Sequence, residues 1–159
     1  MIEVIKENIQ GKVVFLGIGN ILREDDGVGC VFAERLNKAL PNNFNQILVL
    51  NGGEAPENYL EVVVNAKADK IFIVDAVDFG GEPGDIKLFE KAQPQYGFST
   101  HGLSLGFVLD YLKENTKAKV YIVGIQPEKV GWGEGLSYRV EKAVKNLVED
   151  LLEYLKSKS

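Results

Sequence analysis

The segment GNILREDDGVG places three carboxylates, Glu24, Asp25 and Asp26, in one turn of the chain. Acids are common at helix starts, where the helix dipole favours negative charge, and this explains one or two of the three. Three acids in one turn repel one another, so protonation, separation or a bound cation must relieve the repulsion. The turn is therefore a candidate for carboxylate or metal chemistry.

Two further segments supply the other groups of a candidate metal site. Asp75 directly follows the apolar run KIFIV, where packing explains an acid poorly, and His101 is the only histidine of the chain. A lone histidine is by default a surface or capping residue, but the presence of Asp75 favours a ligand role. Together with Asp26, Asp75 and His101 form a set of oxygen and nitrogen ligands. Such a set suits a borderline divalent ion and not a closed structural zinc site. Such an ion can polarise a carbonyl, activate water or mark a substrate for recognition, and the sequence leaves these roles open.

Two other acids compete for roles in this site. Asp25 is a reserve candidate, but as the immediate neighbour of Asp26 we expect it to point in a different direction. Asp78 follows Asp75 closely, and we expect it to cap the turn at Gly80 and Gly81 at least as readily as it would bind a metal.

Two familiar motifs occur without the partners that their chemistry needs. The turn Gly17-Ile18-Gly19-Asn20 resembles a dinucleotide-binding fingerprint, but Leu22 stands in place of the third glycine and no Walker lysine follows. The run GLSLG around Ser104 fits the pattern of a serine-hydrolase nucleophile, which requires a later histidine, whereas the single histidine precedes it. We therefore predict a helix start at this run and not a catalytic serine.

Cys30 and Trp132 have simpler interpretations. The single cysteine excludes an internal disulfide and a cysteine-based zinc cluster. We expect Cys30, which lies on the first long helix, to pack in the protein core. Trp132, in the run GWGEG, either lines a cleft or anchors a partner, or it covers the edge of the core.

Apolar runs of strand length alternate with helical patterns along the chain. The strand-like runs are 13–18, 46–50, 70–74, 85–89 and 120–124, and the helical patterns cover 27–40, 57–67, 103–114 and 136–156. This order predicts a three-layer α/β fold with a mostly parallel, twisted sheet of about five strands and helices on both faces. The run 85–89 alternates and is expected to be an antiparallel or edge strand. The candidate residues then lie at the carboxyl ends of the strands, where open sheets bind ligands.

Length and composition limit the remaining possibilities. We expect the 159 residues, 45% hydrophobic, to form a single domain over 1–159 with residues 155–159 frayed. The net charge of −5 and the dispersed basic residues argue against a nucleic-acid partner. The charged N-terminal segment and the lack of a run of ~20 apolar residues predict a cytoplasmic protein without membrane insertion. Without a heptad seam, we expect a monomer.

Five segments in register, GIGNILREDDGVG, NGGEAPEN, VDAVDFGGEPGDI, STHGLSLGFVLDYLKE and VGIQPEKVG, resemble the hydrogenase maturation endopeptidase family. The resemblance spans roughly residues 13–132 and is greatest to the branch that serves hydrogenases of the formate-hydrogenlyase type. It implies a protease that removes the C-terminal extension of a [NiFe]-hydrogenase large-subunit precursor after nickel insertion. The family's metal-binding residues correspond to Asp26, Asp75 and His101, and Asn51 stands where many members carry aspartate.

The resemblance also implies a mechanism, which we state as a hypothesis. Nickel carried by the precursor is the recognition element, held by Asp26, Asp75 and His101, although another divalent metal is a possible occupant. Asp26 or Asp75 activates water, so the enzyme is an aspartic-type or metal-assisted endopeptidase. Two alternatives remain: a non-catalytic maturation chaperone that binds nickel or the precursor, and a small-molecule metallohydrolase.

Overall fold

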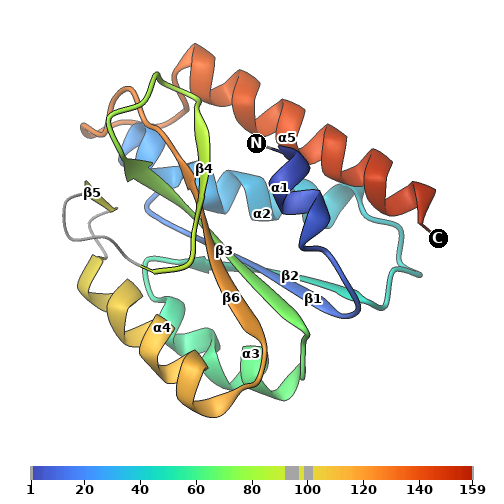
Figure 1. The fold of residues 1–159 in the computed structure, drawn as a ribbon. Helices are drawn as coiled ribbons and strands as arrows, with labels where there is room; N and C mark the ends of the chain where they lie inside the picture. The colour runs from blue at the N-terminus through green and yellow to red at the C-terminus, as the bar shows by residue number, and fades with distance from the viewer. Residues whose placement is uncertain (1, 92–96, 99–101, 159) are drawn as a thin grey trace.

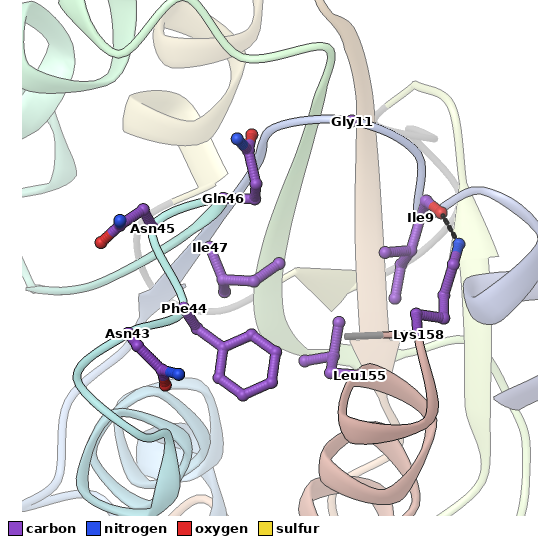
Figure 2. Close-up of a pocket in the computed structure, with 9 residues that line it drawn as sticks. All are labelled: Ile9, Gly11, Asn43, Phe44, Asn45, Gln46, Ile47, Leu155 and Lys158. Atoms are coloured by element: carbon purple, nitrogen blue, oxygen red, sulfur yellow. Dashed lines mark hydrogen bonds between the residues drawn. The ribbon is translucent and has the colours of Figure 1, made fainter.

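The computed structural model describes residues 2–91, 97–98 and 102–158, and His101 lies outside this part of the chain. A twisted central sheet runs through the molecule and has helices on both faces (Figure 1). The strands are β1 (Val13–Ile18), β2 (Ile47–Gly53), β3 (Lys70–Asp78), β4 (Ile86–Phe89), β5 (Gly97–Phe98) and β6 (Lys119–Ile125). The helices are α1 (Ile2–Glu7), α2 (Val28–Ala39), α3 (Leu60–Asn65), α4 (Gly102–Asn115) and α5 (Tyr138–Ser157), with 3-10 turns η1 (Glu24–Gly27) and η2 (Pro56–Tyr59).

The main sheet has the strand order β2-β1-β3-β6-β4. The pairs β1–β2, β1–β3 and β3–β6 are parallel, and β4 lies antiparallel to β6 at the edge. The predicted α/β fold with a mostly parallel sheet of about five strands is confirmed, as is the antiparallel edge position of 86–89. The short β5, which pairs with Val77 and Asp78 at the end of β3, was not predicted.

Both faces of the sheet are buried, because side chains on successive strand residues point to opposite sides. Val13 and Phe15 of β1 pack with residues of α1, α2 and α5, whereas Val14 and Leu16 pack with residues of α3 and α4. Figure 1 shows these two helical layers on either side of the sheet. The last helix continues through Ser157, part of the segment for which we expected fraying.

Several elements differ from the predictions. The helix α1 was not predicted, because its six residues are too short to display a helical period, although Ile5 packs in the core. The predicted helix over 57–67 consists of η2 followed by α3. The strand β3 continues through Asp78, so Asp75 lies inside a strand and does not follow one; pairing with β6 and β5 extends the strand there. None of the helices in the described ranges has the length and apolar character needed to cross a membrane.

Candidate functional site

The loop after β1 and the 3-10 turn η1 form one wall of the candidate site. Within η1, Glu24 has φ 51°, a left-handed conformation that residues with a side chain seldom adopt. The backbone therefore turns sharply just before Asp25 and Asp26. Both of these aspartates are buried, with relative exposures of 0% and 2%.

Asp26 is held against the loop that leaves β1. Its Oδ2 accepts a hydrogen bond from the backbone N–H of Asn20 at 3.1 Å. Its carbonyl oxygen lies so close to Gly19 that a Cβ on that glycine would be 2.0 Å away, and Gly19 has φ 141°. A side chain at position 19 would therefore displace Asp26, so close packing explains the glycine at this position of the GIGN turn.

The start of α2 brings Asp26 and Asp75 to the same edge of the sheet. A Cβ on Gly29 would lie 2.4 Å from the carbonyl oxygen of Ile18 and 2.2 Å from that of Val74. The helix start thus contacts the ends of β1 and β3, and η1 also contacts β3. Because Asp75 directly follows Val74, the two predicted carboxylates share this edge.

The surroundings of Cys30 also indicate that Asp26 and Asp75 lie near each other. Cys30 is buried, as predicted, and its thiol donates a hydrogen bond to the carbonyl oxygen of Gly19 at 3.5 Å. Burial raises the pKa of this thiol to about 11, and the negative charges of Asp75, Asp26 and Glu54 also raise it. Three carboxylates from three segments therefore lie around one thiol.

A cavity of about 270 Å³ opens beside this group of acids. The residues that line it come from the ends of β1 and β2 and from the start of α2: Gly19, Asn20, Ile21, Leu22, Cys30, Asn51, Gly53 and Glu54. Asn20 links the residues that line the cavity. The Nδ2 of Asn20 donates to Glu54 Oε1 at 3.0 Å, and its Oδ1 accepts from the backbone N–H of Leu22 at 2.9 Å. The volume suits a short polypeptide segment or a small molecule, not a folded domain.

Asp25 points away from Asp26, as predicted, and its role is structural. Its carboxylate accepts hydrogen bonds from the backbone N–H groups of Glu128 and Lys129 at 2.9 Å each, and from that of Ser137 at 2.8 Å. The hydroxyl of Ser137 donates a fourth at 2.5 Å. These donors bind the carboxylate to the loop between β6 and α5, so Asp25 is not a reserve member of the site.

Asp78 caps its turn as predicted. Its Oδ1 accepts from the backbone N–H of Gly80 at 3.2 Å and from Nε2 of Gln126 at 3.0 Å. Sequence reasoning missed Gln126, a buried amide whose Oε1 accepts from the backbone N–H groups of Phe79 and Gly81. Its position directly after an apolar strand was the available signal, as it was for Asp75.

Trp132 is 78% exposed, so the predicted alternative in which it covers the core edge is wrong. Its ring lies 5.3 Å from the guanidinium carbon of Arg23.

The helix α4 begins at Gly102, and the GLSLG run forms its first turns, as predicted, in place of the strand-to-helix turn of a serine hydrolase.

The predicted set of metal ligands stays a prediction. Within the described ranges, no group of three histidine, cysteine, aspartate or glutamate side chains is arranged to hold a metal ion. The predicted set includes His101, which lies outside those ranges. Asp26 and Asp75 supply buried carboxylate oxygens at one sheet edge, and this donor chemistry fits a divalent ion that takes its other ligands elsewhere.

The fold and this edge define an α/β protein with a cavity near the carboxyl ends of its parallel strands, lined in part by Glu54, and with the buried carboxylates of Asp26 and Asp75 at the same sheet edge. The sequence profile of the hydrogenase maturation protease family matches residues 30–154. The chain is 32% identical over 140 residues to the hydrogenase 3 maturation protease of Escherichia coli, covering 87% of each protein. It is 34% identical over 152 residues to a putative hydrogenase maturation protease of Methanocaldococcus jannaschii, covering 91% of this chain and 96% of the relative.

Solved structures agree with the sequence relatives. The crystal structure of a [NiFe] hydrogenase maturation protease from Thermococcus kodakarensis matches with a TM-score of 0.85 and 35% identity, covering 96% of this chain and 99% of that one. This chain belongs to the hydrogenase maturation protease family.

Proposed function

We propose that this protein is an endopeptidase that removes the C-terminal extension of a [NiFe]-hydrogenase large-subunit precursor. The observation that carries the proposal is the pair of buried carboxylates, Asp26 and Asp75, at one sheet edge beside a cavity of segment size. In a member of this protease family, such a pair supplies a base beside a space that admits a polypeptide segment.

Peptide hydrolysis needs a group that takes a proton from water. In our proposal, the carboxylate of Asp26 or Asp75 accepts this proton as the water oxygen attacks the scissile carbonyl carbon. The same carboxyl group then returns the proton to the leaving amine as the C–N bond breaks. Nearby backbone N–H groups would stabilise the negative oxygen.

The nickel of the precursor is part of the substrate in this proposal. Asp26, Asp75 and His101 would hold it and so position the adjoining chain in the cavity. Bound there, the ion would supply a Lewis acid or serve for recognition only. Support comes from the donor chemistry of the two aspartates and from β5, which brings the chain to the end of β3 shortly before His101. We further propose a cytoplasmic monomer, and the single buried thiol of Cys30 supports a compartment without disulfides.

Intact-mass spectrometry tests the proposed function directly. The purified protein is incubated with its co-encoded large-subunit precursor, with and without inserted nickel. We expect loss of a C-terminal peptide from the nickel-loaded form alone, and no loss with an Asp26→Asn variant. Binding without any change of mass in either form would favour the maturation chaperone. Turnover of free peptides or esters without a protein partner would favour the small-molecule metallohydrolase.

A further inference from the structure

Four large apolar side chains that the structure leaves exposed lie on two neighbouring loops. Ile21 and Leu22, on the loop after β1, are 57% and 50% exposed, and Val130 and Trp132, on the loop after β6, are 43% and 78% exposed. We call these four residues the loop surface. Scattered apolar side chains are ordinary on a protein surface, whereas a contiguous group marks an interaction site.

Backbone pairing makes the loop surface contiguous. Arg23 and Gly133 form an isolated parallel bridge. In it, the N–H of Glu24 donates to the carbonyl of Gly133 at 2.8 Å, and the N–H of Gly133 donates to the carbonyl of Leu22 at 2.8 Å. The Nη2 of Arg23 also donates to the carbonyl of Val130 at 2.9 Å. The two loops are therefore held together before any partner binds.

The indole of Trp132 contacts the guanidinium of Arg23, although most of the ring faces solvent. The guanidinium carbon of Arg23 lies 5.3 Å from the ring centroid, a cation–π distance. A restrained, exposed tryptophan loses little side-chain entropy when a partner covers it and then gains the full benefit of burial. Residues of this kind dominate the energy of protein interfaces.

The loop surface continues into the cavity of the proposed site. Ile21 and Leu22 line that cavity together with Cys30 and Glu54, and Leu22 is joined to Gly133 beside Trp132. A polypeptide that leaves the cavity on this side passes over Leu22 and reaches the indole. Its side chains must be apolar to displace water from these four residues favourably.

We propose that the loop surface binds an apolar segment of the large-subunit precursor that adjoins the scissile bond. This inference rests on the proposed function, because it names the part of that substrate which the cavity rim holds. The loop surface then determines affinity for the precursor, while the buried carboxylates break the bond. Trp132 is the central contact.

Steady-state kinetics with the nickel-loaded precursor separate affinity from chemistry. We expect Trp132→Ala to raise KM by about thirtyfold and to change kcat by less than about threefold. Tyr138→Ala is the matched control, since this aromatic side chain is also 78% exposed but lies outside the loop surface; both of its constants should stay within about twofold of wild type. Circular dichroism and thermal unfolding establish that both variants are folded.

The outcomes for the two proposals are distinguishable. If the wild-type protein leaves the precursor uncut, the proposed function fails whatever the variants do. If the wild-type protein cuts the precursor and Trp132→Ala has the wild-type KM, the docking inference alone is overturned. A fall in kcat with an unchanged KM also overturns it, because a docking residue affects binding.

Cross-linking identifies the occupant of the loop surface. A cleavage-deficient Asp26→Asn protein, with photoreactive p-benzoylphenylalanine in place of Trp132, is irradiated with the nickel-loaded precursor and digested for peptide mapping. We expect cross-links to an apolar segment next to the cleavage position. Cross-links to a distant part of the precursor contradict the proposal. Cross-links to a second copy of this chain, with a dimer in sedimentation analysis, also contradict it.

Discussion

Asp25 and Asp26 are adjacent in the chain, yet their carboxylates bind opposite loops. Asp25 accepts hydrogen bonds from Ser137, on the loop that precedes α5, whereas Asp26 accepts one from Asn20, on the loop that follows β1. Asp25 is satisfied by four donors, while Asp26 lies beside the cavity near Asp75. Two neighbouring acids of the same type thus have separate tasks, one in stability and one in the proposed chemistry.

Replacing Asp25 should cost stability. Asp25→Ala removes a buried acceptor and leaves the N–H groups of Glu128, Lys129 and Ser137 without it, so we expect the free energy of unfolding to fall by about 3–5 kcal/mol. Urea unfolding measures the change. Asp110→Ala, at an exposed acid on α4, serves as the control and should change the free energy by less than about 0.5 kcal/mol. An Asp25→Ala protein as stable as wild type would refute this assignment.

Replacing Asp26 should cost activity and leave the fold intact. Asp26→Asn keeps the shape of the side chain and an oxygen that can accept from the N–H of Asn20, but it cannot take a proton from water. We expect processing of the precursor to slow by at least about a hundredfold, as for loss of a general base. Intact-mass time courses measure the rate, and near-ultraviolet circular dichroism checks the fold. An unfolded variant would show that Asp26 is structural.

The sequence predicted the parts of the site that depend on residue type and on position at a strand end. Asp75 was selected because an acid beside an apolar strand stands out, and Asp26 because three acids crowd one turn. The role of Asp25 was not predictable, since its donors are more than a hundred residues away, with Glu128 at a separation of 103. The extension of β3 past Asp75 depends on pairing with β6 and with β5, and β5 is a strand of two residues that shows no period.

The close approach of α2 to the sheet should tolerate no side chain at Gly29. A Cβ there would lie 2.2 Å from the carbonyl oxygen of Val74, which is backbone and cannot move aside easily. We expect Gly29→Ala to lower the free energy of unfolding by about 2–3 kcal/mol and to reduce processing. Gly106→Ala is the matched control, because nothing lies within 4 Å of its Cβ position on α4. It should stabilise the helix by about 0.5–1 kcal/mol. Equal effects of the two substitutions would contradict this explanation.

The thiol of Cys30 should be inert in the native protein. Burial raises its pKa from 9.0 to about 11, which lowers the thiolate fraction at neutral pH by about a hundredfold. We expect native protein at pH 8 to react with Ellman's reagent at least about a hundred times more slowly than protein unfolded in urea. Rapid labelling of the native protein would show that the cavity admits reagents to the thiol.

The ion pair between Arg35 on α2 and Glu141 on α5 predicts a pH dependence of stability. The two side chains form a bidentate pair, with Arg35 Nη2 and Glu141 Oε1 2.6 Å apart, and the guanidinium lowers the pKa of Glu141 below its ordinary value of 4.5. Because the folded-state pKa is lowered, the pair contributes stability above pH 4.5 and loses that contribution as the pH falls further. The side chains are 39% and 41% exposed, so we expect Glu141→Gln to cost less than about 1 kcal/mol at pH 7.

Urea unfolding of wild type and Glu141→Gln at several pH values tests this prediction. The difference in free energy of unfolding should be largest at pH 7 and low salt, and it should shrink as the pH falls below 4.5 and Glu141 takes up a proton in the folded wild type. It should also shrink in 1 M salt, since exposed ion pairs are screened. Glu34→Gln provides the control, because its pair with Lys38 lies within α2 and joins no second helix. A difference that stays constant as the pH falls below 4.5 would mean that Glu141 stabilises the α2–α5 contact by packing and not by charge.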